Sequence, residues 1–418
     1  MTTIFRSACA LTLACATAVS VGGCNLDVAN PSVIDAATFN PNTDGTTLSL
    51  SAQTNFFIAF QSVALYGGLI SEELWSGAAR LQTNRLAARV FASTDDINGN
   101  FFTPLSLAIA SNENAIGALQ GGAGAATDLN LARASMNLGF ALELMAETMC
   151  AGVIQGGPQL SDAQLTDSAI TRFSNAIAVA TAAGTSGAAI VNASNVGLAR
   201  AYLQKGDYAH ASQTAALVPA SFQANVITSA NVSTQTTLGN QFYRITAGAQ
   251  IVAPQRYRVG DPRLSIDSTR PGSTLNGVPY IVQAKYNTYG DPIRLASGLE
   301  AQYIAAEAAL HGSSSTSAAI TLINARRAAG GQGAYAGATD TLSVITELLN
   351  QRARDFWLEG KKLGDLRRNP SVALASVLTD PNATLTYFPS KTPPTFGSTF
   401  CAPIPPQETS ANPNFKSP

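Results

Sequence analysis

Histidine, tryptophan and charge are all scarce in this chain of 418 residues. It has two histidines and two tryptophans, and its charged residues make up 12%, about half the usual share of ~25%. The net charge is −1 and no basic block is present, so nucleic acid is not an expected partner. The motifs of zinc proteases, phosphate-binding loops and nucleophile elbows are missing, as is metal-ligand spacing of Cys and His. We therefore expect no metal, no cofactor and no enzymatic activity.

Carboxylates are the remaining source of possible catalysis. The neighbouring pairs are Glu72-Glu73, Asp95-Asp96, and Glu143 with Glu147. A glycoside hydrolase needs two carboxylates about 5 to 9.5 Å apart across a sugar. The sequence does not exclude a pair that is distant along the chain. Helix capping and solvent exposure explain these residues with fewer assumptions, so a glycan-cleaving enzyme is the less favoured alternative.

The first residues have the pattern of a secretory signal. Arg6 is the only charged residue before position 24, and an apolar run follows over 8–21. The run is too short to span ~30 Å of hydrocarbon. It ends in Val-Gly-Gly-Cys, which resembles a bacterial lipobox with Cys24 as the acylated residue. We predict a signal peptide over 1–23 and a lipid-anchored tether over 24–45. The alternative is ordinary secretion with an incidental cysteine.

Two further cysteines remain once the signal peptide is removed. Cys150 and Cys401 would lie in an oxidising compartment, where paired cysteines are commoner than free ones. A disulfide between them would close a long loop and, in the chain-entropy model, stabilise the folded state by up to ~5 kcal/mol. Two buried free thiols are the alternative.

Apolar residues recur at helical spacing over most of the chain. The expected helices are 46–66 (ended by Gly67-Gly68), 101–119, 128–150, 163–183, 188–204, 208–218, 299–311, 317–329 and 342–363. Several form hairpins with small residues that let two helices approach closely, as in Lys205-Gly206-Asp207 between the helices 188–204 and 208–218. Such imperfect pairs resemble tetratricopeptide repeats.

The fold class we predict is mainly α, with tetratricopeptide-like helical hairpins forming a scaffold, irregular loops and few short strands. A single domain is expected after the tether. This domain covers 46–418. Its parts are a repeat scaffold over about 128–220 and 298–368, a loop-rich segment over about 221–297, and an irregular C-terminal segment over 369–418.

A series of motifs in fixed order resembles the SusD/RagB family of nutrient-binding lipoproteins. The stretches are Asn30-Pro31-Ser32, Asp261-Pro262-Arg263, Lys285-Tyr286, 292–296 (PIRLA), 300–307 (EAQYIAAE), 323–327 (INARR), 352–360 (RARDFWLEG), 364–368 (GDLRR), 403–407 (PIPPQ) and 412–414 (NPN). Each piece alone is a weak signal, whereas the series covers nearly the whole mature chain.

This resemblance implies a location and a partner. Such proteins are anchored in the bacterial outer membrane, face the cell exterior and cap a SusC-like TonB-dependent transporter, to which they deliver a nutrient, often an oligosaccharide. The alternative, from another class, is an envelope lipoprotein whose repeats bind only proteins. The motif residues read as an internal ion network and not as a ligand site: Asp261, Arg263, Glu359, Asp365, Arg367 and Arg368.

No sugar-binding residue carries over by motif, so the ligand contacts must be chosen on chemistry. Burying ~80 Å² of apolar area at ~25 cal/mol per Å² gives roughly 2 kcal/mol per aromatic stack, and polar partners must add to it. Trp75 is the first candidate, with a second aromatic pair in the loop-rich segment; packing is the alternative for both. The candidate contacts are Trp75, Tyr66, Arg80, Asn84, Tyr286 and Tyr289.

Overall fold

The computed structural model describes residues 40–77, 80–270, 279–372 and 397–416. The chain divides into two compact units, Met1–Asp44 and Gly45–Pro418. The predicted signal peptide, Cys24 and most of the predicted tether lie outside the described residues and stay predictions. The larger unit contains all of the described strands and nearly all of the described helical residues.

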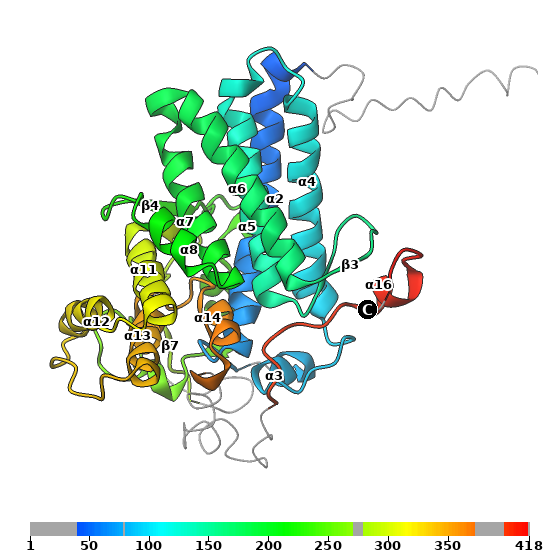
Figure 1. Ribbon diagram of the computed structural model, residues 1–418. Helices are drawn as coiled ribbons and strands as arrows, with labels where there is room; N and C mark the ends of the chain where they lie inside the picture. Colours follow the sequence, from blue (N-terminus) through cyan, green and yellow to red (C-terminus); the bar gives the residue numbers. More distant parts are fainter. Residues whose placement is uncertain (1–39, 78–79, 271–278, 373–396, 417–418) are drawn as a thin grey trace, which may run out of the picture. The chain divides into compact units, whose positions relative to one another are not determined.

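Helices account for most of this unit, shown in Figure 1. Their bounds are α2 Pro41–Ile70 (which begins in the smaller unit), α3 Leu81–Ala87, α4 Thr103–Leu119, α5 Leu129–Thr148, α6 Asp162–Ala182, α7 Ala188–Lys205, α8 Tyr208–Ala215, α9 Gln235–Leu238, α10 Gln241–Ala247, α11 Gly298–Ser313, α12 Ser317–Ala329, α13 Thr341–Asp355, α14 Lys362–Arg368 and α16 Pro406–Ala411. None of the described helices is long and apolar enough to cross a membrane.

The strands are short and pair only in twos within the described residues. The antiparallel pairs are β1 Trp75–Ser76 with β5 Ile251–Val252, β2 Gly152–Val153 with β3 Gln159–Leu160, β4 Gln223–Val226 with β8 Ile293–Ser297, and β6 Ile266–Asp267 with β7 Val282–Gln283. The predicted fold class, mainly α with few short strands, is confirmed.

Consecutive helices pack against each other as hairpins from α4 to α8, and α11 joins α7 and α8 to the pair α12–α13. Local sequence explains where they begin and end. Ser161 and Gln164 form a reciprocal capping box at the start of α6. Gly206 ends α7 with a φ of 81°, which glycine adopts without strain, and Asp207 caps α8 through the His210 amide.

Small residues bring the central helices close together around one aromatic cluster. The rings of Phe140 on α5 and Phe173 on α6 meet edge-on, with centroids 4.9 Å apart. A Cβ at Gly139 would lie 2.8 Å from the Phe173 ring, and one at Gly197 would lie 2.4 Å from it. Because both glycines face the same ring, α5, α6 and α7 can share a core that larger residues would force apart.

Several helix boundaries differ from the prediction; α2, for example, begins at Pro41 and not at residue 46. Gly67 and Gly68 do not end α2, which runs on to Ile70. Both glycines are buried, and the packing of their helix outweighs a propensity cost of about 1 kcal/mol each.

The predicted helix over 342–363 is in fact two helices, α13 and α14, with a corner at 356–361 between them. Leu358 and Gly360 take positive φ values of 62° and 69° there. The Trp357 indole donates a 2.8 Å hydrogen bond to the Glu73 carbonyl oxygen, and the Leu358 amide donates one of 3.0 Å to the Glu73 carboxylate. Contacts with a distant segment therefore hold a turn that the local pattern does not signal. The short helices α9 and α10 in the loop-rich segment were likewise not predicted.

Candidate ligand-binding site

The two favoured aromatic candidates are packed inside the protein. Trp75 lies in β1 and is 2% exposed, while Tyr286 is 4% exposed. The Tyr286 ring stacks on Phe242 at 5.4 Å, and its hydroxyl donates a 3.2 Å hydrogen bond to the Leu358 carbonyl oxygen. Neither ring offers a face on which a sugar could stack. The prediction that Trp75 and Tyr286 contact the ligand is therefore not supported, and their burial favours the packing alternative.

The other candidates are spread over several elements. Arg80 is exposed just before α3, and Asn84 lies within that helix. Tyr289 is half-buried and meets Tyr243 edge-on at 4.9 Å. Tyr66, on α2, is half-buried against Phe101 at 6.3 Å. Of the six candidates, Tyr66 lines a cavity with about 330 Å³ of volume.

That cavity, which we call the Tyr66 cavity, has a volume of about 330 Å³. It lies between α2, the turn that leads into α4, and the segment from α9 to α10. The lining residues are Ile58, Ser62, Leu65, Tyr66, Gly99, Asn100, Pro104, Thr236, Thr237, Gln241 and Arg244.

Direct hydrogen bonds hold its three walls in register. The Ser62 hydroxyl donates to the Asn100 carbonyl oxygen at 2.8 Å, which joins α2 to the turn before α4. The Gln61 side chain accepts from the Gln241 amide at 3.1 Å, which joins α2 to the start of α10. The walls therefore come from segments far apart in the sequence, and they are preformed.

The lining of the Tyr66 cavity combines apolar with polar side chains. Ile58, Leu65 and the Tyr66 ring supply apolar surface, whereas Gln241 and Arg244 contribute an amide and a guanidinium. Burial raises the pKa of the Tyr66 hydroxyl, so it stays protonated at neutral pH and can donate a hydrogen bond. A few polar groups placed around an apolar surface are typical of small-molecule sites.

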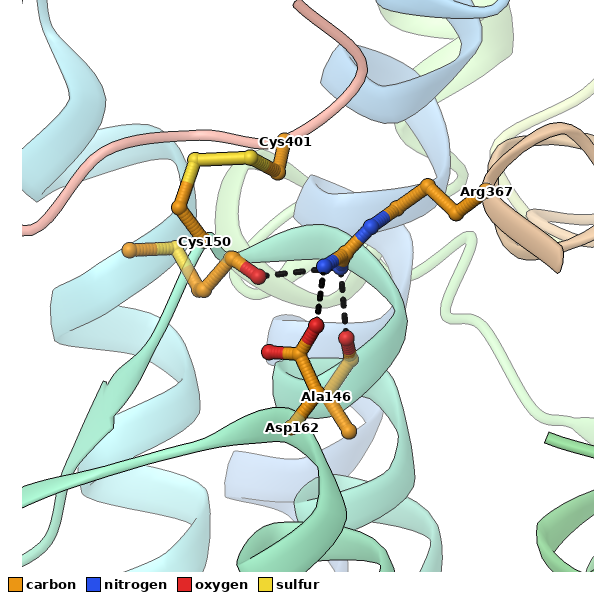
Figure 2. The surroundings of a disulfide bond; sticks show 6 residues. Ala146, Cys150, Asp162, Arg367 and Cys401 are labelled. Atoms are coloured by element: carbon orange, nitrogen blue, oxygen red, sulfur yellow. Dashed lines mark hydrogen bonds and ion pairs between the residues drawn. A yellow bond between two sulfur atoms is a disulfide. The ribbon is translucent and has the colours of Figure 1, made fainter. Parts of the chain in front are cut away.

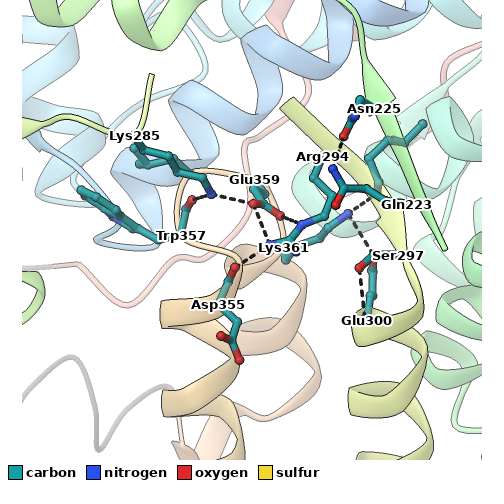
Figure 3. A network of polar contacts seen from close by, with 12 residues as sticks. Gln223, Asn225, Lys285, Arg294, Ser297, Glu300, Asp355, Trp357, Glu359 and Lys361 are labelled. Carbon is teal, nitrogen blue, oxygen red and sulfur yellow. Dashed lines mark hydrogen bonds and ion pairs between the residues drawn. The ribbon is translucent and has the colours of Figure 1, made fainter. Parts of the chain in front are cut away.

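The motif residues at the corner after α13 form an ion network instead of a ligand site. Glu359 accepts from Arg294 at 2.8 Å and also pairs with Lys285, whose ammonium donates to the Trp357 carbonyl oxygen as well (Figure 3). Glu359 is only 2% exposed. This carboxylate therefore ties the corner to β8 and to the segment after β7.

The Asp-Pro-Arg motif makes a second group of ion pairs. Arg263 pairs with Asp261 at 2.6 Å and with Asp355, the last residue of α13, at 3.2 Å. Asp355 also accepts from Arg326 on α12 at 2.7 Å and from the Tyr303 hydroxyl on α11 at 2.6 Å. One carboxylate thus joins three helices and the motif.

The Gly-Asp-Leu-Arg-Arg motif supplies a third group, on α14. Asp365 accepts from Arg352 at 2.8 Å and from Arg368 at 2.7 Å, and Arg368 also reaches Glu307 on α11 at 3.2 Å. These residues are all nearly inaccessible to solvent. Their role is to fix α14 to the repeats.

Arg367 and the disulfide hold the C-terminal end of α5 (Figure 2). Cys150 and Cys401 are bonded to each other across 251 residues, as predicted. The backbone of Ala402 exchanges hydrogen bonds of 2.8 Å with Thr148 and Cys150. Arg367 donates to the Met149 carbonyl oxygen at 2.9 Å and pairs with Asp162 at the start of α6.

Of the three carboxylate pairs considered for catalysis, two are buried and not solvated as we expected, while in the third Asp95 is buried and Asp96 is exposed. Glu143 and Glu147 are 0% and 2% exposed, and Glu72 and Glu73 are 5% and 1% exposed. Burial first, and then the neighbouring Glu147, raise the pKa of Glu143 well above its usual range. None of these carboxylates is among the residues that line the Tyr66 cavity.

The fold defines a class, a mainly helical protein built on tetratricopeptide-like hairpins, with the Tyr66 cavity beside them. Residues 283–417 match the sequence model of the SusD family. A SusD superfamily protein from Bacteroides vulgatus has a TM-score of 0.66 at 15% identity, over 90% of this chain and 98% of that chain.

Other solved structures agree. A SusD superfamily protein from Parabacteroides distasonis gives a TM-score of 0.64 at 12% identity, over 90% of this chain and 99% of that one. A SusD-like carbohydrate binding protein from Bacteroides vulgatus gives 0.62 at 15% identity, over 79% and 84%. No curated protein sequence matches the chain. The chain thus has the fold of these SusD superfamily structures, and its C-terminal third matches the SusD family in sequence, which confirms the predicted resemblance.

Proposed function

We propose that this protein is a cell-surface lipoprotein that binds a nutrient, an oligosaccharide, and delivers it to a SusC-like TonB-dependent transporter. The observation that carries the proposal is the Tyr66 cavity, whose lining combines an aromatic ring and apolar side chains with amide and guanidinium groups. A sugar presents an apolar face and a rim of hydroxyls, which these groups complement. The carbohydrate-binding description of one structural neighbour points in the same direction.

A binding role fits the structure better than catalysis. Four of the paired carboxylates, Glu72, Glu73, Glu143 and Glu147, lie in the core, where they lack access to an extended glycan. Among the described residues, no group of His, Cys, Asp and Glu could hold a metal ion. The acylated Cys24, the outer membrane, the outward orientation and the transporter complete the proposal on the strength of the lipobox and the family motifs.

Saccharide binding to purified protein tests the proposal. A glycan array identifies a binder, and calorimetry then compares wild type with Tyr66→Ala and Gln241→Ala. We expect each variant to weaken binding by about tenfold, because a lost stack or a lost hydrogen bond costs about 1 to 2 kcal/mol. Tyr208→Ala is the matched control, since Tyr208 is also half-buried but stacks on His311 away from the cavity.

Three results would count against the proposal. Glycan binding that survives both cavity variants would move the site elsewhere. Absence of glycan binding together with co-purification of protein partners would favour the envelope scaffold. Release of a cleaved product from the bound glycan would favour the enzyme.

A further inference from the structure

A second cavity has a chemistry unlike that of the first. Its volume is about 160 Å³, and it lies where the segment after β5 meets α13 and α14. Three cationic side chains, Arg256, Arg354 and Lys362, line it, and Asp365 is the one carboxylate among its lining residues. We call it the cationic cavity.

Two polar groups of this cavity lack a partner. The Lys362 ammonium and the Tyr257 hydroxyl are buried, and Lys362 and Tyr257 are 7% and 3% exposed. Neither group makes a hydrogen bond to any described residue. The ammonium lies over the Tyr257 ring, 5.3 Å from its centroid. Buried polar atoms are nearly always paired, so two in one cavity call for an acceptor that the chain itself does not supply.

Two of the nearby carboxylates, Asp365 and Glu72, are already engaged by other cations, and a third, Glu73, accepts a 3.0 Å hydrogen bond from the Leu358 amide. Asp365 is held by Arg352 and Arg368 at 2.8 and 2.7 Å. Glu72 pairs with Arg89 at 2.8 Å and with Arg256 at 3.4 Å. Positive charge therefore remains in excess at Lys362 and Arg354.

We propose that the cationic cavity is a binding site for a small oxyanion, namely an inorganic sulfate or phosphate or the acidic group of a sugar acid. The anion accepts hydrogen bonds from the Lys362 ammonium and the Tyr257 hydroxyl, and Arg354 contributes charge at the half-buried edge. The Tyr66 cavity plays no part in this site, so the inference does not depend on the proposed function.

Anion binding at this site is coupled to protonation of Lys362. Burial, and then the cation Arg256, lower the pKa of Lys362 to about 7, with Arg89 acting in the same direction and Glu72 and Glu73 against it. A bound anion favours the ammonium form and raises this pKa, so binding takes up a proton near neutral pH. Affinity should accordingly be greater at pH 6 than at pH 8.

Calorimetry on purified protein at constant ionic strength tests the site. Potassium sulfate is compared with potassium chloride, and glucuronate with glucose. We expect sulfate or glucuronate to bind, and Lys362→Met and Arg354→Gln each to weaken binding by about tenfold or more. Tyr257→Phe, which removes only the hydroxyl, should weaken it less. Arg172→Gln on α6, away from the cavity, is the matched control and should leave binding unchanged.

The outcomes separate the sources of the anion. Binding of sulfate without glucuronate indicates a free inorganic ion, and binding of glucuronate without glucose indicates an acidic saccharide. Lack of binding by either anion at pH 6, or equal binding by wild type and all three cavity variants, overturns the proposal. If Lys362→Met does not fold, Arg354→Gln and Tyr257→Phe still decide it.

Discussion

Glu300, at the start of α11, shows how single residues hold charge inside this protein. It is fully buried, and three cations surround its carboxylate: Arg200 at 2.9 Å, Lys361 at 3.3 Å and Arg352 at 3.6 Å. Burial alone would raise its pKa, but Arg200, Lys361 and Arg352 outweigh burial and lower the pKa to about 2. The carboxylate is therefore ionised and joins α7, α11, α13 and the corner before α14.

Replacing Glu300 by Gln should lower the free energy of unfolding by about 3 to 5 kcal/mol, because buried cations lose their counter-charge. Urea denaturation at pH 7 measures the change. Asp167→Asn is the matched control, since Asp167 forms an exposed pair with Lys205 that should be worth at most about 1 kcal/mol. Equal losses in the two variants would contradict a central role for Glu300.

The same residue predicts a pH dependence. Its pKa in the folded state, about 2, lies below the ordinary value of 4.5, so ionised Glu300 stabilises the fold fully above pH 4.5. That contribution is lost as pH falls from 4.5 towards 2. The stability gap between wild type and Glu300→Gln should therefore narrow over this window.

At the scale of elements, the C-terminal segment is fastened to the end of α5. The disulfide between Cys150 and Cys401 stands beside the backbone hydrogen bonds of Ala402 with its neighbours on that end. Arg367 adds contacts to the same turn from α14 (Figure 2). The end of α5 is therefore fixed both by the covalent bond and by α14.

Removing the disulfide should cost about 2 to 5 kcal/mol of unfolding free energy in the double variant Cys150→Ser with Cys401→Ser. In wild type, both thiols should resist alkylation after unfolding until a reductant is added. Cys401→Ser alone leaves Cys150 free and should label after unfolding without reductant. Labelling of unfolded, unreduced wild type at Cys150 would rule out the bond.

Elements set by local signals were predictable from the sequence. The pair α7–α8 was expected because Gly206 and Asp207 mark its turn, and α12 was expected over the residues it occupies, 317–329. The corner after α13 was not predictable, because the positive φ of Leu358 depends on Glu73, 285 residues away.

The candidate site divides in the same way. Tyr66 was chosen from its neighbours in the sequence and does line a cavity. Gln241 was missed, because the hydrogen bond that brings it to the cavity joins residues 180 positions apart. Trp75 was chosen because an aromatic ring can stack on a sugar, yet a large aromatic ring is equally suited to packing in a protein core. Residue type alone does not distinguish an aromatic residue that lines a cavity from one that packs in the core.

At the scale of the whole molecule, the proposed function requires that the larger unit stay at the membrane. None of its described helices could span a bilayer. Acyl chains on Cys24 would supply the attachment, since each buried methylene contributes about 0.8 kcal/mol and more than one chain gives stable anchoring.

Replacing Cys24 by Ala should therefore move the protein from the membrane pellet to the soluble fraction. Fractionation followed by immunoblotting measures the shift. A high-salt wash is included because contact with a transporter could by itself retain some protein through charged groups, which salt screens. Cys15→Ala is the matched control, because Cys15 lies inside the predicted signal peptide and its loss should leave the protein in the pellet. Retention of Cys24→Ala after the wash would show that something other than acyl chains on this cysteine holds the protein at the membrane.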